Sequence, residues 1–234
     1  MLVPNYLIIA ATNAEVQPFA KHYKKNKNIL YKDVKIEILI TGVGLMAATY
    51  SITNYSNNHY KPAVIIMIGI AGCYNSKVKL GEVFAIKSEV VADMGVQENN
   101  TWYDMCDLHF IPPNDEPYTN GKLINSNKTM LHLCNVPVVN AVTVNQITTD
   151  NAIIKMYKTK YLPQLESMEG AALHYSCLQK NIPFVQLRGV SNYIGERDKS
   201  KWNITQAITN VNNVAISFLS KLLLTNNNNA IPTH

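Results

Sequence analysis

Arginine is nearly absent from this sequence: of 21 lysine and arginine residues in 234, only Arg188 and Arg197 are arginine. The net charge of +5 at pH 7 comes from lysines that are spread along the chain and form no basic arm. Nucleic-acid binding favours clustered cations, arginine above all. The sequence therefore gives little support to a nucleic-acid partner.

Cysteines are also few and far apart. The four cysteines form no CxxC pair and no Cys/His spacing typical of zinc sites: Cys73, Cys106, Cys134 and Cys177. We therefore expect no metal site, and we expect reduced thiols such as a cytoplasmic protein carries.

Long apolar runs are missing as well, so we expect no membrane span. The first apolar stretch, LVPNYLIIAA, is short, lacks a basic region before it and soon reaches Glu15. It is predicted to be a buried strand and not a signal peptide. The sequence favours a cytoplasmic protein without a membrane partner.

Short apolar runs are plentiful, and they alternate with segments of helical periodicity. Runs that end at Gly, Ser or Asn indicate strands covered on both faces. We expect one α/β domain over residues 1–225, a three-layer α/β/α sandwich with a central mixed sheet, and a disordered tail over 226–234. The predicted strands are 6–10, 36–41, 64–70, 83–91, 136–144 and 184–190, and the predicted helices include 46–57, 151–158, 169–180 and 205–224.

Residues 92–122 do not fit the alternation. The segment is rich in Pro, Asn and Asp and carries several aromatic side chains. Long loops in compact domains are usually functional or lie at an interface, although a disordered excursion is the alternative. We favour a binding lid or a subunit contact.

Two glycine turns follow neighbouring predicted strands. GVGLMAA, with Gly42 and Gly44, matches G-x-G-x-x-A, but the acidic residue that a dinucleotide site needs about twenty positions later is absent. A nicotinamide-dependent oxidoreductase is therefore disfavoured. Gly44, together with Ala71 and Gly72 after the next strand, still permits close approach of a ligand at the carboxyl ends of the strands.

Three stretches carry side chains suited to chemistry. IIAATNAEVQPF places Glu15 at the start of a helix, LESMEGAAL places Met168 and Glu169 at a strand-to-helix junction, and LRGVSNYIG places Arg188 inside a strand that ends near Asn192. A carboxylate at a helix N-terminus can simply favour the helix dipole, and an Asn can simply cap a turn. A buried arginine, however, needs a carboxylate partner.

Together with TGVG and GIAG, these stretches resemble the nucleoside phosphorylase and nucleosidase superfamily over nearly the whole chain. Within it, SMEGAA and RGVSNYIGERDKSKW are most similar to the futalosine hydrolase family, which releases hypoxanthine in a route to menaquinone. The resemblance implies a nucleoside phosphorylase-like fold, a nucleoside substrate and no cofactor. It also implies a homodimer or higher homo-oligomer in which the aromatic loop near 102–118 covers the partner's site.

The resemblance also implies roles for individual residues. Glu15 would activate water with Arg188 nearby, Glu169 would hold the ribose hydroxyls, and Met168 would pack against the sugar. Asn145 and Gln146 would line the base pocket. Arg197 would hold the far end of the substrate or order its loop through Asp198.

Asn192 stands where adenine-specific nucleosidases of the superfamily have an aspartate. An amide can donate to a carbonyl O6 and accept from a protonated N7, which suits hypoxanthine or guanine. Reversing one buried hydrogen bond changes discrimination by roughly five- to a hundredfold. Asn192 therefore favours a 6-oxopurine.

Water is the expected nucleophile, because phosphorylases of the superfamily hold phosphate with several arginines and none precedes Arg188 here. Two alternatives remain: a methylthioadenosine/S-adenosylhomocysteine nucleosidase, and a catalytically silent nucleoside-binding protein.

Overall fold

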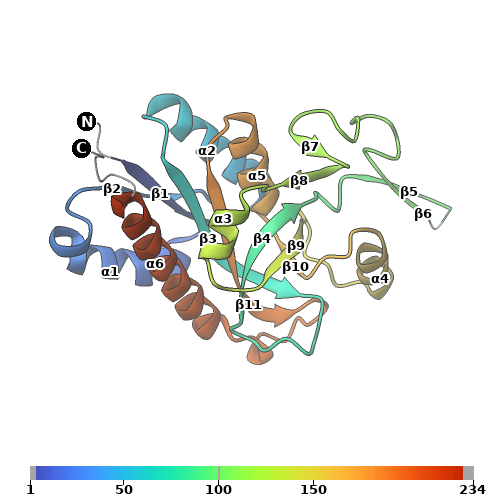
Figure 1. Cartoon of the computed structure of the whole chain (residues 1–234). Coiled ribbons are helices and arrows are strands. Elements are labelled where there is room, and N and C mark those ends of the chain that lie inside the picture. Colours follow the sequence, from blue (N-terminus) through green and yellow to red (C-terminus); the bar gives the residue numbers. More distant parts are fainter. Residues whose placement is uncertain (1–3, 100, 229–234) are drawn as a thin grey trace.

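The computed structural model describes residues 4–99 and 101–228, in which a nine-stranded mixed sheet lies between helices (Figure 1). The strands run in the order β2-β1-β3-β10-β9-β4-β8-β7, and β11 pairs with both β3 and β4. The strands of this sheet are β1 (Asn5–Ala10), β2 (Lys35–Ile40), β3 (Val64–Cys73), β4 (Val83–Glu89), β7 (Tyr118–Thr119), β8 (Lys122–Ile124), β9 (Val138–Thr143), β10 (Leu165–Ser167) and β11 (Phe184–Tyr193).

Strands β2, β1, β3 and β11 run parallel to one another. β1 pairs in parallel with β2 and β3, and β11 pairs in parallel with β3 and antiparallel with β4. The carboxyl ends of β1, β3 and β11 therefore meet at one edge, where an open α/β sheet binds its ligand.

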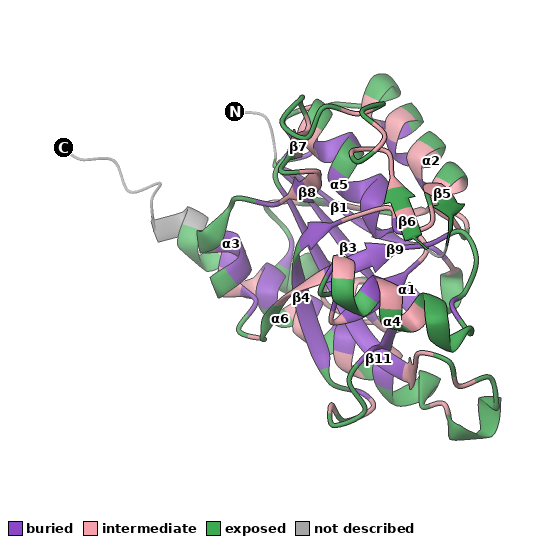
Figure 2. Cartoon of the chain, turned by 90° about the vertical axis from the view of Figure 1, so that its right-hand side faces the viewer, coloured by how far each residue is buried: buried purple, intermediate pink, exposed green. Residues whose placement is uncertain are grey.

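Helices cover both faces because successive strand residues point to opposite sides. In β1, Tyr6 and Ile8 pack with α1 (Asn13–Leu30), α3 (Lys128–Leu133) and α6 (Ile204–Asn228), whereas Leu7 and Ile9 pack with α2 (Leu45–Asn58) and α5 (Gly170–Gln179). A further cluster packs under α4 (Asn151–Lys160). Figure 2 shows the buried strands enclosed by these helices, which confirms the predicted three-layer α/β/α architecture.

Helix α6 corrects one expectation. Over Ile204–Thr225 it is long and apolar enough to cross a membrane by length and composition alone, which the sequence reading had missed. In this fold it is a core helix, because Val211, Ala215, Phe218 and Leu219 on its inner face are completely buried against the sheet.

The other predicted elements agree closely with the structure, with two differences. Residues 92–122 are not one irregular loop: they contain the hairpin β5 (Gly95–Glu98) and β6 (Thr101–Asp104), which stands at the side of the sheet in Figure 1, as well as β7 and the start of β8. Helix α6 continues through residues 226–228, which we expected in the tail; residues 229–234 lie outside the described residues.

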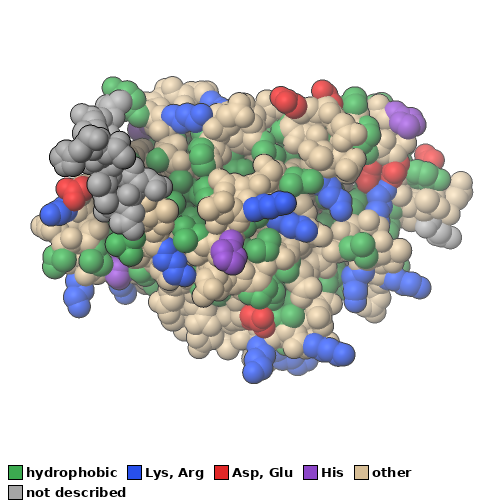
Figure 3. Space-filling view, in the orientation of Figure 1, with side chains coloured by type: hydrophobic (Ala, Val, Ile, Leu, Met, Phe, Trp, Pro, Cys, Tyr) green, Lys and Arg blue, Asp and Glu red, His purple; other side chains and the backbone are tan. Residues whose placement is uncertain are grey.

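Basic side chains are distributed across the face shown in Figure 3 and alternate with acidic and hydrophobic ones. This matches the scattered lysines of the sequence.

Candidate active site

A cavity of about 310 Å³ opens at the carboxyl ends of the central strands. Its wall combines the start of α1, the end of β3, the β10–α5 junction, the end of β11 and the start of α6. The lining residues are Ala11, Thr12, Ala14, Glu15, Val43, Ile70, Ala71, Gly72, Val144, Ile147, Glu166, Ser167, Met168, Glu169, Ser191, Asn192, Ile194, Trp202, Ile204 and Ile208.

Glu15 is fixed at the β1–α1 turn by a capping box. Thr12 caps the helix, and Oε2 of Glu15 accepts hydrogen bonds from the Thr12 backbone N (3.0 Å) and Oγ1 (2.9 Å). Its other oxygen, Oε1, accepts from the Ile70 backbone N at 3.1 Å. The side chain is 7% exposed, so it presents an oriented carboxylate to the cavity.

The first turn of α1 is supported by α6. Pro18 has no N–H and interrupts the ladder of α1, and the buried side chain of Asn212 enters there. Asn212 accepts from the Phe19 backbone N at 2.9 Å and donates to the Glu15 backbone O at 2.7 Å. The amide thereby satisfies both backbone groups next to the interruption.

Glu169 lies at the N-cap of α5 and joins two other elements. Its Oε1 accepts from the Gly44 backbone N at 3.0 Å, and its Oε2 forms an ion pair with Arg188 Nη2 at 3.3 Å. Arg188 is 2% exposed and also donates to the Ile70 carbonyl at 3.3 Å. The pair is buried and mutually compensated, as a buried arginine requires.

Gly69 makes this arrangement possible. A β-carbon there would lie 2.3 Å from Nη1 of Arg188 and 3.0 Å from Oε1 of Glu15. The guanidinium therefore passes directly beneath the backbone of β3, behind the cavity and close to both carboxylates.

The opposite end of the cavity is formed by Asn192. A β-bulge in β11 leaves Ser191 without a partner in β3 and places Asn192 opposite Gly72. Ser191 Oγ donates to Asn192 Oδ1 at 2.8 Å, and Asn192 Nδ2 donates to the Tyr193 carbonyl at 3.1 Å. The amide thus has a defined orientation.

Strand β3 therefore runs from one end of the site to the other. The carboxylates of Glu15 and Glu169 lie near its residues 69–70, and Asn192 lies beside Gly72. Two to three residues of strand span roughly 7 to 10 Å. A sugar at the first end and a base at the second would fit this length.

The cavity residues that the sequence did not predict include Glu166, Ser167 and Trp202. Ser167 Oγ is buried and has no hydrogen-bond partner among the described residues. The acid and serine before Met168 in LESMEG were the available signal, since β10 brings both to the site.

Five sequence-predicted residues lie outside the lining, and two of them, Gly44 and Arg188, bind Glu169 from behind it. Asn145 and Gln146 are exposed, and their backbone N–H groups are bound by the Asp93 carboxylate, so the neighbouring Val144 and Ile147 face the cavity instead. Arg197 is exposed, with its guanidinium carbon 5.5 Å from the ring centre of Trp202, which itself lines the cavity.

A further buried carboxyl, that of Glu89, lies behind the site. Glu89 is 0% exposed, accepts from Gln186 Nε2 at 2.9 Å and from Thr143 Oγ1 at 3.0 Å, and burial raises its pKa to about 7. Thr143 Oγ1 in turn accepts from the Ala171 backbone N at 2.8 Å, at the first turn of α5. This chain of bonds connects Glu89 to the helix that begins at Glu169.

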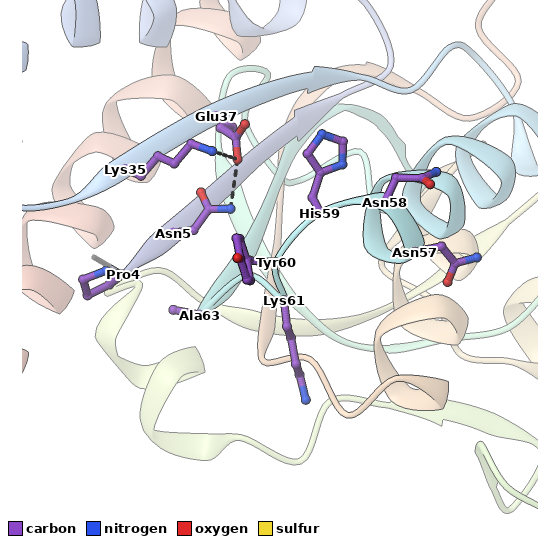
Figure 4. Close-up of a pocket in the computed structure, with 10 residues that line it drawn as sticks. All are labelled: Pro4, Asn5, Lys35, Glu37, Asn57, Asn58, His59, Tyr60, Lys61 and Ala63. Carbon is purple, nitrogen blue, oxygen red and sulfur yellow. Dashed lines mark hydrogen bonds and ion pairs between the residues drawn. The ribbon is translucent and has the colours of Figure 1, made fainter. Parts of the chain in front are cut away.

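A larger hollow of about 780 Å³ lies at the other end of β1 and β2 (Figure 4). There Glu37 accepts from Asn5 at 2.9 Å and pairs with Lys35 at 3.1 Å, as the dashed lines show. None of the side chains predicted for chemistry lies in it. Across residues 4–99 and 101–228, no three His, Cys, Asp or Glu side chains group so as to hold a metal ion.

The chain is similar to known proteins in sequence. A family model described as "Phosphorylase superfamily" matches residues 5–224. A futalosine hydrolase of Thermus thermophilus is 27% identical over 176 residues, covering 73% of this chain and 75% of that protein. A 5'-methylthioadenosine/S-adenosylhomocysteine nucleosidase of Buchnera aphidicola is 24% identical over 163 residues, covering 69% and 68%.

Solved structures share the fold. Futalosine hydrolase of Helicobacter pylori superimposes with a TM-score of 0.75 at 14% identity, over 94% of this chain and 98% of that one. The 5'-methylthioadenosine/S-adenosylhomocysteine nucleosidase of the same organism, solved with butyl-thio-DADMe-Immucillin-A, gives a TM-score of 0.75 at 13% identity, over 94% and 100%.

Proposed function

Because the chain belongs to the phosphorylase superfamily, we propose that it is a purine nucleosidase that hydrolyses the N-glycosidic bond of futalosine. The products are hypoxanthine and dehypoxanthinyl futalosine, and the reaction serves menaquinone biosynthesis in the cytoplasm. The observation that carries the proposal is an oriented amide, Asn192, at the end of the cavity away from the carboxylates of Glu15 and Glu169.

In the proposed reaction, the C1′–N9 bond breaks and its electron pair stays with the purine, while water forms the new bond to C1′. Glu15 takes the proton of this water, as a general base must. Glu169 binds the ribose hydroxyls, and its ion pair with Arg188 holds it in place. Solvent supplies a proton to N7 of the departing base, since the Asn192 amide has none to give, and Asn192 accepts from this N7–H and donates to O6.

Water is favoured over phosphate by the charges around the cavity. Among the described residues, no lysine or arginine lines it: Arg188 is engaged with Glu169, and Arg197 lies against the Trp202 ring. A phosphate dianion needs cationic or strongly donating partners, preferably arginine forks.

We also propose that the protein acts as a homodimer or higher homo-oligomer. Val43 and Ile147 line the cavity yet are 59% and 43% exposed, and Met46 and Tyr50 on α2 are 86% and 70% exposed. A second copy placed on this apolar rim would close the site, and the aromatic segment 102–118 is the candidate for that contact. Sedimentation of the purified protein tests this.

One assay tests the reaction: purified protein with futalosine, inosine, methylthioadenosine or adenosine, with and without phosphate, following the released base. We expect hypoxanthine from futalosine without phosphate. Adenine release from methylthioadenosine, with futalosine untouched, would establish instead the nucleosidase activity named for the Buchnera relative. A phosphate requirement with formation of ribose 1-phosphate type products would rule out the hydrolase. Binding of futalosine without turnover would identify a silent binder.

A further inference from the structure

Glu166 is a carboxylate in the cavity wall that the chemistry at the sugar does not use. It lies on β10, is 5% exposed and lines the cavity. Its Oε2 accepts from the Tyr74 hydroxyl at 2.5 Å, and its Oε1 accepts from the Thr148 backbone N at 3.1 Å. Within the described part of the chain it has no cationic partner.

The sheet register places Glu166 across from Asn192. Glu166 pairs with Gly72 on one side of β3, and Asn192 pairs with the same Gly72 on the other side. Neighbouring strands lie about 4.8 Å apart, so the two backbones are separated by roughly 10 Å. The side chain of Ile194 packs over Gly72, where a β-carbon would lie 2.4 Å from Ile194 Cδ1, and it lines the cavity. A fused-ring base lying on Ile194 would have Glu166 at one edge and Asn192 at the other.

We propose that Glu166 accepts the N1–H of the 6-oxopurine, an inference that rests on the proposed function. A carboxylate has about four lone-pair positions, and only two are occupied by Tyr74 and Thr148. Hypoxanthine and guanine carry a hydrogen on N1. Adenine has a lone pair there, which would face the lone pairs of Glu166.

The two groups that bind Glu166 leave its carboxylate able only to accept hydrogen bonds from a ligand. Both are donors, and burial raises the pKa of the Tyr74 hydroxyl, so it keeps its proton. Glu166 therefore offers only acceptors to the cavity. Asn192 hydrogen-bonds to N7 and O6 of the base, and Glu166 hydrogen-bonds to N1. Two independent groups therefore both favour a 6-oxopurine.

Inhibition by free bases tests this directly. The inhibition constants of hypoxanthine, 1-methylhypoxanthine and adenine are measured for the wild type, Glu166→Gln and the exposed control Glu98→Gln. In the wild type, hypoxanthine should bind about 5- to 100-fold more tightly than the other two, the range for one buried hydrogen bond. In Glu166→Gln, hypoxanthine should weaken while adenine does not, because a glutamine amide can donate to N1 of adenine.

The outcomes are separable from those of the function assay. A folded Glu166→Gln protein with the wild-type ratio of hypoxanthine to adenine binding would overturn the inference. If this variant does not fold, equal inhibition of the wild type by hypoxanthine and 1-methylhypoxanthine overturns it equally well. Failure of the wild type to cleave futalosine would remove the proposed function, whereas the base ratios would still decide the role of Glu166.

Discussion

The carboxyl group of Glu89 fills the space that a side chain at Gly170 would need. A β-carbon at Gly170 would lie 1.9 Å from Oε1 of Glu89 and 2.5 Å from Nε2 of Gln186. The first turn of α5, which follows Glu169, therefore approaches β4 as closely as it does only because residue 170 has no side chain. The buried carboxyl and the glycine depend on each other.

Gly170→Ala should destabilise the protein by about 1 to 3 kcal/mol, the usual cost of overpacking. Urea unfolding measures this loss. Combining it with Glu89→Ala removes the clashing carboxyl, so the double variant should lose less stability than the sum of the two single losses. Simple additivity of the two losses would show that the residues do not compete for space.

The stability contribution of Glu89 should depend on pH. Burial raises its pKa to about 7 from an ordinary 4.5, so the folded protein binds a proton that the unfolded chain has lost. This contribution is complete below about pH 4.5 and is lost as pH rises through 7. Glu89→Gln cannot ionise, so its stability relative to wild type should increase between pH 5 and pH 8.

The contribution of His174 to stability changes with pH in the opposite direction. Burial lowers the pKa of His174 to about 4. Its contribution to the stability of the folded protein is therefore present above pH 6.5 and is lost as pH falls toward 4. Because both proteins contain His174, the difference between Glu89→Gln and wild type isolates Glu89. Urea midpoints across the pH range measure it, with Glu98→Gln as an exposed control; a flat difference for Glu89→Gln would contradict the assignment.

Glu15→Gln should lower kcat by about 10²- to 10⁴-fold, the range for loss of a positioned general base. Binding of hypoxanthine should stay unchanged, because Glu15 lies at the sugar end of the cavity. Steady-state release of base and product inhibition measure the two effects. Unchanged turnover would show that another group activates the water.

Asn192→Asp should move the preference toward 6-aminopurines. A carboxyl can accept from an exocyclic amino group and protonate N7, so kcat/KM for methylthioadenosine relative to futalosine should rise by about 5- to 100-fold. Asn213→Asp, on the exposed side of α6, should leave the ratio unaltered. An unaltered ratio in the Asn192 variant would place the base elsewhere.

Asn212→Ala should affect both folding and turnover. It leaves the Phe19 N–H and the Glu15 carbonyl without their partner, at a cost of about 1 to 3 kcal/mol for such a buried loss. Because the same turn orients Glu15, kcat should fall more than KM rises. The neighbouring Asn213→Ala, on an exposed position, is the matched control, and equal behaviour of the two variants would argue against this role.

Periodicity predicted most of the fold because each buried strand and helix carries its own local signal. Glu15, Glu169 and Asn192 were expected at one site, and the structure brings all three to the same cavity. Arg188 was expected near Glu15, and it lies directly behind the cavity wall.

What sequence reading missed depends on contacts between distant elements. Glu166 reaches the cavity only because β10 inserts beside β3, and Trp202 reaches it through the turn after β11. Asn145 and Gln146 were assigned to the base pocket, but Asp93, some fifty residues earlier, holds their backbone outside it. No local sequence pattern predicts such a contact between distant residues.

The bulge in β11 has a consequence for how the base is chosen. In a regular strand, consecutive side chains leave on opposite faces, so a hydroxyl and an amide at adjacent positions could not meet. The one additional residue at Ser191 puts both on the same side, where the serine aligns the amide. Substrate choice in this protein is therefore sensitive to the length of the end of β11. Removing a single residue there should weaken discrimination between purine bases, even if every polar group at the base end of the cavity is retained.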